Sequence, residues 1–143
     1  MIARATLWPE ARVDINALPD WARRLAAVQA IVSLQENPWL GTELRERVRV
    51  GDLRGLRRVA FDEPGWNDKP RYRVVYRNEP DDTVVEIVAV IAVGRRERLT
   101  AYRAAAARLR AERRAGSSTS RTYGPKKSSS ISSRSSAFGG SGA

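Results

Sequence analysis

The spacing of apolar and polar residues divides the first 40 residues into a short strand and two helices. Residues 2–7 alternate between apolar and polar side chains, which predicts a strand. Pro9 suits the first turn of a short helix that ends at about Ala17. A longer amphipathic helix is predicted over about 20–36, with Asp20 as its N-cap, and the Asn-Pro pair after it ends it. Its apolar side chains recur at helical spacing, at Trp21, Leu25, Val28, Val32 and Leu34 or Gln35.

Three strands and a final helix are predicted in the second half of the chain. The first strand covers 56–61, and a loop rich in Pro, Gly, Asn and Asp separates it from an alternating strand at 71–77. A hairpin turn at 78–82 leads to a third strand at 83–93. Because this third strand is β-branched on both faces, we expect it at a central position, covered above and below. Helical spacing returns over 99–114.

This order of elements predicts an α+β fold in which helices pack on an antiparallel sheet. A further turn or two of helix is expected around 43–49, between two glycines. Residues 1–114 are predicted to form one domain. Residues 115–143 are predicted to be a disordered, basic tail, because 11 of its last 27 residues are serine and it has too little apolar surface to offset the entropy of ordering.

The composition excludes several classes of chemistry. The chain contains no Cys and no His, so disulfides, thiolate or histidine metal sites and Ser-His-Asp triads are excluded, and we predict no metal and no cofactor. The N-terminus lacks the pattern of a signal peptide. No apolar run approaches the roughly 20 residues that span a bilayer. We therefore expect a soluble, cytoplasmic protein with no membrane partner.

Positive charge is concentrated where the strands begin. The formal net charge of +10 arises from −1 over residues 1–44, +7 over 45–114 and +4 over 115–143. Such a distribution is typical of a surface that binds a polyanion. Equally, the excess of Arg over Lys is consistent with a GC-rich genome and a solvated surface, and composition does not separate these two interpretations.

Two blocks near the strand ends contain groups suited to phosphate chemistry. RNA cleavage without metal or histidine requires stabilisation of the charge that grows on the phosphate oxygens, and guanidinium groups provide it by paired hydrogen bonds. Arg73 and Arg96 have this chemistry, and Tyr102 offers an aromatic face for a base. Each also has a structural interpretation: Arg73 as a surface partner of Glu86, Arg96 as part of a hydrated turn, and Tyr102 as a core residue.

The segment from about Leu25 to Leu109 resembles the RelE/ParE superfamily of toxins from type II toxin-antitoxin systems. The resemblance rests on Asn37-Pro38, Gly41, Leu44, Leu53-Arg54-Gly55-Leu56-Arg57-Arg58, Tyr72-Arg73-Val74-Val75-Tyr76, Val93-Gly94-Arg95-Arg96-Glu97-Arg98, Tyr102 and Arg108-Leu109. It implies a RelE-like fold and metal-independent cleavage of mRNA on the ribosome. It also implies inhibition by an acidic, partly disordered antitoxin that folds as it binds.

The resemblance assigns roles to individual residues. It implies that Arg73 stabilises the reacting phosphate, that Arg96 acts as general acid or charge stabiliser, and that Tyr102 stacks on the mRNA. Neighbouring basic residues are predicted to bind RNA, namely Arg57, Arg58, Arg71, Arg95 and Arg98.

One position departs from the family pattern. Where RelE-like toxins have two basic residues separated by one position, this chain has Arg58 and then Ala60, so the usual candidate for general base is missing, unless Arg57 or Lys69 compensates. Two alternatives therefore remain open: a ParE-like toxin that inhibits DNA gyrase without this catalytic set, and a degenerate member that only binds a partner or nucleic acid.

Overall fold

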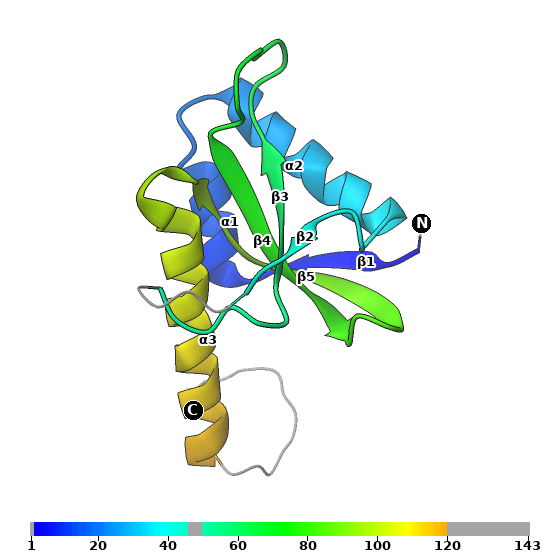
Figure 1. Ribbon diagram of the computed structural model, residues 1–143, viewed down its shortest axis with the longest axis vertical. Helices are drawn as coiled ribbons and strands as arrows, with labels where there is room; N and C mark the ends of the chain where they lie inside the picture. The colour runs from blue at the N-terminus through cyan, green and yellow to red at the C-terminus, as the bar shows by residue number, and fades with distance from the viewer. Residues whose placement is uncertain (1, 46–49, 120–143) are drawn as a thin grey trace, which may run out of the picture. The chain divides into compact units, whose positions relative to one another are not determined.

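A computed structural model of the chain describes residues 2–45 and 50–119 (Figure 1). The described residues up to Arg108 form one compact unit, and the helix residues from Leu109 onward belong to a second unit. The elements are β1 (Arg4–Leu7), α1 (Pro9–Asn16), α2 (Trp21–Glu36), β2 (Thr42–Glu43), β3 (Arg57–Phe61), β4 (Tyr72–Pro80), β5 (Val85–Arg95), the 3-10 turn η1 (Glu97–Leu99) and α3 (Thr100–Thr119). Among these residues, no helix is both long and apolar enough to cross a membrane.

The five strands form one mixed sheet in the order β1-β5-β4-β3-β2. The expected antiparallel pairing of the three later strands is confirmed, because β3 pairs with β4 and β4 with β5 in antiparallel registers. β1 joins the other side of β5 in a parallel register, Arg4 opposite Ile87. The α+β class is therefore confirmed, with one parallel pair at the sheet edge. β5 lies between two strands, and its residues 88–93 are buried on both faces as expected.

The helix boundaries follow the sequence signals closely. Pro9 occupies the first turn of α1. The Asp20 side chain caps α2 by accepting a hydrogen bond from the Arg23 backbone N–H at 2.9 Å. α3 continues through Thr119, five residues beyond the boundary expected for the domain, and the rest of the expected tail, 120–143, lies outside the described residues.

Two predictions about local structure are wrong. The expected hairpin turn at 78–82 lies later, because β4 continues through Pro80, with Asn78 opposite Val88. The turn begins at Asp81, whose carboxylate accepts backbone hydrogen bonds from Thr83 and Val84 at 2.8 and 2.9 Å. These hydrogen bonds lower the pKa of Asp81.

The second error concerns the helical turn expected around 43–49. Glu43 belongs instead to β2, where it pairs with Arg57 of β3, and 46–49 lie outside the described residues. The close approach of this segment to the sheet requires glycine at position 41. A Cβ there would lie 2.6 Å from the Tyr76 hydroxyl oxygen, which accepts the Gly41 N–H at 3.0 Å.

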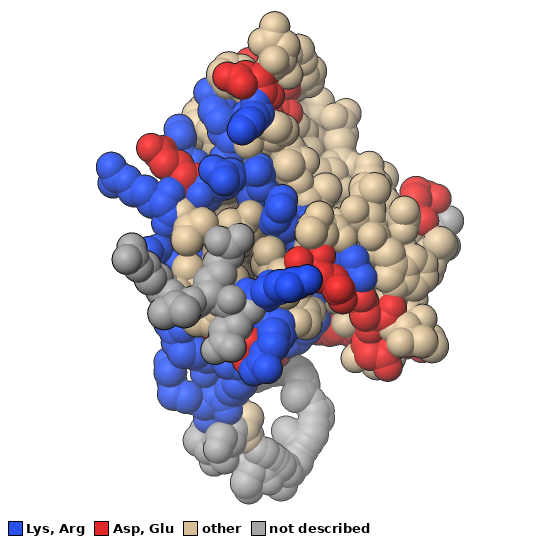
Figure 2. Space-filling model, in the orientation of Figure 1, with Lys and Arg blue, Asp and Glu red and all other residues tan. Residues whose placement is uncertain are grey.

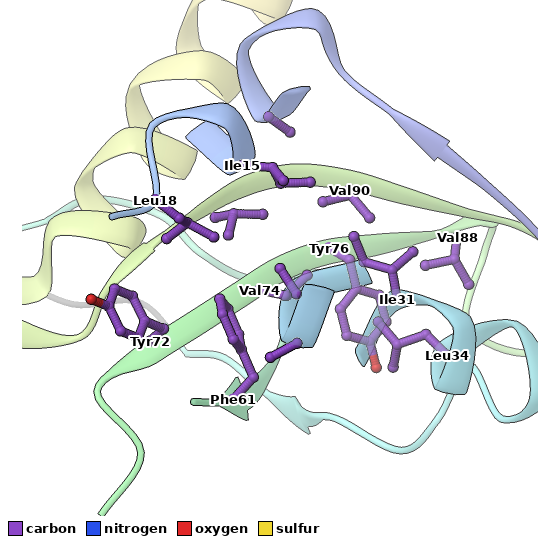
Figure 3. Packing of buried hydrophobic residues seen from close by; sticks show 14 of the residues in the cluster. Ile15, Leu18, Ile31, Leu34, Phe61, Tyr72, Val74, Tyr76, Val88 and Val90 are labelled. Carbon is purple, nitrogen blue, oxygen red and sulfur yellow. The ribbon is translucent and has the colours of Figure 1, made fainter. Parts of the chain in front are cut away.

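The main core lies between one face of the sheet and the helices α1 and α2. Figure 3 shows Ile15 of α1 and Ile31 and Leu34 of α2 directed toward Val74, Tyr76 and other side chains of the strands. The buried face of α2 is formed by Ala26, Ala27, Ile31 and Leu34. The apolar residues by which the sequence predicts this helix, from Trp21 to Val32, are on its exposed face. On the other sheet face α3 begins over β5, where the Cα of Ala101 is 3.7 Å from a Cβ placed on Gly94.

Candidate nucleic-acid interface

A hollow lined mainly by cationic side chains lies beside the start of β4 and the end of β5, and we call it the basic hollow. Its volume is about 570 Å³. It is lined by Arg58, Lys69, Pro70, Arg71, Arg73, Arg95, Arg96 and Glu97. Six of these eight residues are cationic and one is anionic, so the hollow suits an anion. No group of three His, Cys, Asp or Glu side chains that could hold a metal ion occurs in the part of the chain that the structure describes.

The register of the sheet explains why the hollow lies there. Ala60 of β3 and Gly94 of β5 lie directly opposite Arg73 of β4, on its two sides. Side chains at such paired positions project from the same face of a sheet. Ala60 places only a methyl group beside Arg73, whereas Ala101 of α3 covers Gly94, its Cα 3.7 Å from a Cβ placed on that glycine. Arg58, two residues before Ala60, projects from the same face.

The Arg73 guanidinium is held by hydrogen bonds to two backbone carbonyls. Arg73 is 7 % exposed, and its Nη1 donates to the carbonyl oxygens of Pro70 and Tyr72 at 2.9 and 2.8 Å. Its Nε is buried without a hydrogen-bond partner. Among the described residues no carboxylate pairs with this guanidinium. An anion in the basic hollow would therefore meet a positive charge that the protein leaves unneutralised.

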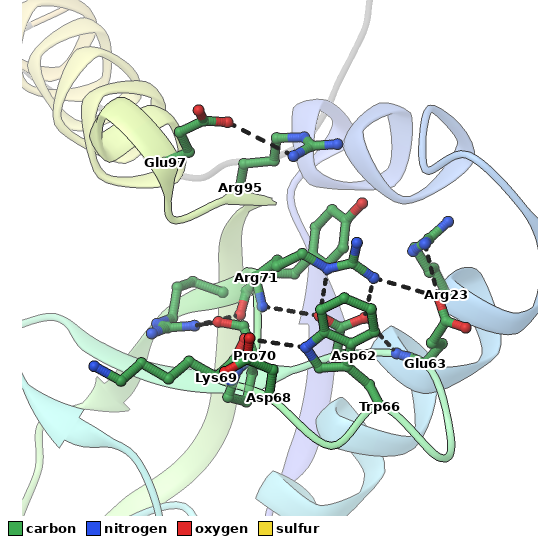
Figure 4. A network of polar contacts seen from close by, with 12 residues as sticks. Arg23, Asp62, Glu63, Trp66, Asp68, Lys69, Pro70, Arg71, Arg95 and Glu97 are labelled. Carbon is green, nitrogen blue, oxygen red and sulfur yellow. Dashed lines mark hydrogen bonds and ion pairs between the residues drawn. The ribbon is translucent and has the colours of Figure 1, made fainter.

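Arg71 has a different environment, because acidic side chains neutralise it (Figure 4). Its Nε and Nη2 both donate to the Asp62 carboxylate at 2.9 Å, and Nη2 lies 3.3 Å from Glu63. The guanidinium carbon is 3.5 Å from the centre of the Trp66 ring. Hydrogen bonding to Arg71 lowers the pKa of Asp62 to about 2, and the same pair raises the pKa of Arg71. Arg71 thus fixes the 62–70 loop against β4.

Arg95 and Arg96 extend the basic hollow at the end of β5, and both are exposed. Arg95 lies 3.7 Å from Glu97 and 5.5 Å from the centre of the Tyr72 ring. The Arg96 backbone N–H donates to the Arg71 carbonyl at 2.9 Å, which attaches the start of η1 to the beginning of β4. The Arg96 side chain has no carboxylate partner within the described part of the chain.

Three predicted site residues do not line the basic hollow. Tyr102 is 2 % exposed in α3, so its ring belongs to the core and is not presented to a base. Arg57 donates to the Asp82 carboxylate and, at 2.7 Å, to the Gly41 carbonyl, and its pKa is raised mainly by the hydrogen bond to Asp82. Arg98 is exposed in η1 with a φ of 56°. Arg57 and Arg58 are consecutive in β3, so their side chains project from opposite faces of the sheet. The sequence alone therefore indicates that only one of the two can line the basic hollow.

Lys69 lines the basic hollow, although the sequence analysis names it only as a residue that could compensate for Ala60. It belongs to the loop after β3, which bends so that the Trp66 indole N–H donates to the Lys69 carbonyl at 3.1 Å. This fold-back brings Lys69 to the rim of the basic hollow, beside Pro70 and Arg71. The Pro, Gly, Asn and Asp content of the loop predicts turns but not their direction.

A family model and two solved structures are similar to this chain. Residues 7–99 match a protein family described as the ParE toxin of the type II toxin-antitoxin system parDE. A structure of a mutant of the Escherichia coli toxin RelE in the free state matches with 23% identity and a TM-score of 0.51, over 76% of this chain and 99% of that one. A chain of the Mycobacterium tuberculosis toxin-antitoxin complex RelBE2 matches with 24% identity and a TM-score of 0.47, over 67% and 100%. No curated protein matches the sequence.

Proposed function

We propose that this chain, which belongs to the ParE toxin family of type II toxin-antitoxin systems, is a toxin that binds and cleaves RNA at the basic hollow. The supporting observation is that Arg58, Arg73 and Arg96, which are far apart in the sequence, line one hollow of about 570 Å³. Guanidinium groups bind phosphate by paired hydrogen bonds. A phosphodiester in the basic hollow would meet cations on several sides.

The reaction would be an attack of the ribose 2′-oxygen on the adjacent phosphorus. The P–O5′ bond breaks as the P–O2′ bond forms, and the products are a 2′,3′-cyclic phosphate and a free 5′-hydroxyl. Arg73 and Arg96 would stabilise the charge that develops on the non-bridging oxygens. Removing one such donor typically costs about 3–4 kcal/mol of transition-state stabilisation.

Two protons must move in this reaction: one leaves the 2′-hydroxyl and one reaches the 5′-oxygen. Arginine cannot exchange a proton at a useful rate, since it remains protonated in proteins. Of the residues that line the basic hollow, Lys69 and Glu97 are the ones that can accept or donate a proton. Ala60 leaves the central position opposite Arg73 without such a group, so slow cleavage is expected.

An antitoxin would act by neutralising the same surface. Figure 2 shows Lys and Arg side chains gathered on one side of the molecule. An acidic segment laid over the basic hollow would pair with its unneutralised arginines and exclude RNA, and electrostatic attraction would speed its association. mRNA on the ribosome is the substrate that we propose, and the antitoxin competes with it.

Expression of the wild type and of Arg96→Ala tests the proposal. The wild type should arrest growth and produce new mRNA 5′ ends, mapped by primer extension. Because losing one charge-stabilising donor slows catalysis about 100- to 1,000-fold, Arg96→Ala should abolish both effects. Arg12→Ala, an exposed arginine of α1 outside the basic hollow, is the matched control and should remain toxic. Equal toxicity of Arg96→Ala with unchanged mRNA ends would exclude RNA cleavage at this site.

A second candidate function is inhibition of DNA gyrase without RNA cleavage. It is favoured by the burial of Tyr102 and by Ala60, because both remove groups that the RelE-like catalytic set requires. In that case, purified protein would inhibit supercoiling by gyrase in vitro. Expression would then cause DNA damage while mRNA ends remain unchanged.

A further inference from the structure

Helix α2 exposes a row of large apolar side chains along one face. Trp21, Leu25, Val28 and Val32 are 69%, 38%, 46% and 50% exposed. Ile2, 55% exposed, lies beside the C-terminal end of the helix, where its N–H donates to the Gln35 carbonyl at 2.8 Å. We call these five residues the α2 strip. Contiguous exposed apolar surface of this kind marks an interaction site more often than isolated apolar residues do.

The α2 strip is uncharged because the arginines of the helix are bound elsewhere. Arg23 donates to Asp20 and Glu63 at 2.9 and 2.6 Å, and Arg24 donates to the Leu18 carbonyl at 3.0 Å. Figure 2 shows a broad area without charged side chains over the part of the molecule where α2 lies in Figure 1. A charged partner segment would gain no electrostatic attraction on this face.

The spacing of the strip is symmetric along the helix. The intervals between Trp21, Leu25, Val28 and Val32 are four, three and four residues, which read the same in both directions. If two such helices pack antiparallel about a two-fold axis, Trp21 faces Val32 of the other copy and Leu25 faces Val28. Each contact then joins a large side chain to a smaller one, so the two rows interdigitate.

We propose that the α2 strip is the contact between two copies of this chain in a symmetric dimer. Pairing of identical patches about a two-fold axis is the commonest way for a chain to self-associate. The net charge of +10 opposes self-association through the basic side of the molecule. The uncharged strip is a face on which two copies can meet without opposing like charges, and it leaves both basic hollows open.

The helix ends are compatible with this arrangement. In the antiparallel pair, Glu36 of one copy lies near the start of α2 in the other, where Arg23 already neutralises the Asp20 carboxylate at 2.9 Å. The α2 strip has five residues, fewer than the roughly 20–30 per side of a stable interface. The dimer is therefore expected to be weak and to form with increasing concentration.

Sedimentation equilibrium of the full chain over a range of concentrations tests this proposal. The wild type should show a monomer–dimer equilibrium. Leu25→Glu places a carboxylate against Val28 of the other copy and should raise the dissociation constant at least about tenfold, since 1.4 kcal/mol corresponds to a factor of ten. The double variant Leu25→Glu/Val28→Lys places Glu opposite Lys across the axis, so it should recover dimerisation that both single variants lose.

Val13→Glu is the matched control, because Val13 is 66% exposed on α1, outside the strip. This variant should dimerise as strongly as the wild type. Circular dichroism confirms that each variant is folded. A wild type that is monomeric at all concentrations overturns the proposal. So does a double variant that dimerises no better than Leu25→Glu. If the wild type is monomeric and Leu25→Glu instead weakens binding of the antitoxin, the strip is the site of the antitoxin.

Discussion

Arg71 and Arg73 are separated by one residue, yet their guanidinium groups have different surroundings. Arg71 is neutralised by Asp62 and Glu63, and the Trp66 ring covers one face of its guanidinium. Arg73 donates only to backbone carbonyls and retains its charge for an anion. At the scale of single residues, the basic hollow therefore combines a structural arginine that shapes the loop with a second arginine whose charge no described carboxylate neutralises.

The Asp62–Arg71 pair predicts a specific acid sensitivity. The Asp62 side chain is 4 % exposed, and its pKa is lowered from 3.8 to about 2. A lowered pKa in the folded state adds stability above about pH 4, and this contribution is lost as the pH falls toward 2. The loss should be about 1–2 kcal/mol. Urea unfolding at pH 5 and at pH 2.5 should show a larger drop for the wild type than for Asp62→Asn, which has no carboxylate to titrate. Equal drops would contradict the assignment.

At the scale of elements, side chains of α1 and α3 satisfy the backbone hydrogen bonds of β5 beyond the point where its neighbour β1 ends. β1 pairs with β5 only through Val90. Beyond this point the Asp14 carboxylate of α1 accepts the Val93 N–H at 3.0 Å, and Arg108 of α3 donates to the Ile91 carbonyl at 2.8 Å. Arg108 also pairs with Asp14 at 2.6 Å. Two side chains thus occupy the hydrogen-bonding positions that another strand would fill.

Replacing Asp14 should release this edge of the sheet. Asp14→Ala removes the acceptor of the Val93 N–H and leaves Arg108 without its carboxylate, so the free energy of unfolding should fall by about 2–4 kcal/mol. Hydrogen exchange should accelerate at the Val93 amide more than at Val75, which is in the interior strand β4. Arg12→Ala, on the exposed face of α1, is the control and should change neither quantity. Unchanged protection of Val93 in Asp14→Ala would contradict the role of this carboxylate.

At the scale of the whole molecule, charge is distributed unevenly over the described surface. Cations gather at the basic hollow, while the exposed face of α2 is uncharged. The two surfaces have different chemistry and so suit different partners. A polyanion would bind by electrostatic attraction, and an apolar face would bind by excluding water.

Binding of single-stranded RNA should therefore depend steeply on salt. Each phosphate that is neutralised adds about −0.7 to the slope of log K against log salt concentration for a single strand. Arg58→Ala and Arg96→Ala should each reduce this slope by about that amount, measured by fluorescence anisotropy with a labelled oligonucleotide. Arg57→Ala should leave the slope unchanged, because the Arg57 guanidinium is bound to Asp82. An equal reduction in Arg57→Ala would show that the charge of the whole surface, rather than the basic hollow, governs binding.

The sequence by itself predicted the α+β class, the helices α1 and α2, the strands β3, β4 and β5, and most of the cationic residues that line the basic hollow. Local signals were sufficient for this: the Asp20 cap, Pro9 in the first turn of α1 and the alternation that separates Arg57 from Arg58. Even the resemblance to toxins rested on short motifs within single elements. These features depend on contacts between residues close in the chain, which periodicity reports directly.

Tertiary packing alone decided which surfaces are buried and which cations remain available. The apolar spacing of α2 predicts a helix but not its orientation, and small alanines pack against the sheet while Trp21 and Leu25 face solvent. Tyr102 is buried in the core. The burial of a helix residue depends on the elements that the helix packs against, which its spacing does not indicate. Arg57 and Arg71 are neutralised by Asp82 and Asp62 across loops. Such pairings join residues distant along the chain, and no local pattern encodes them.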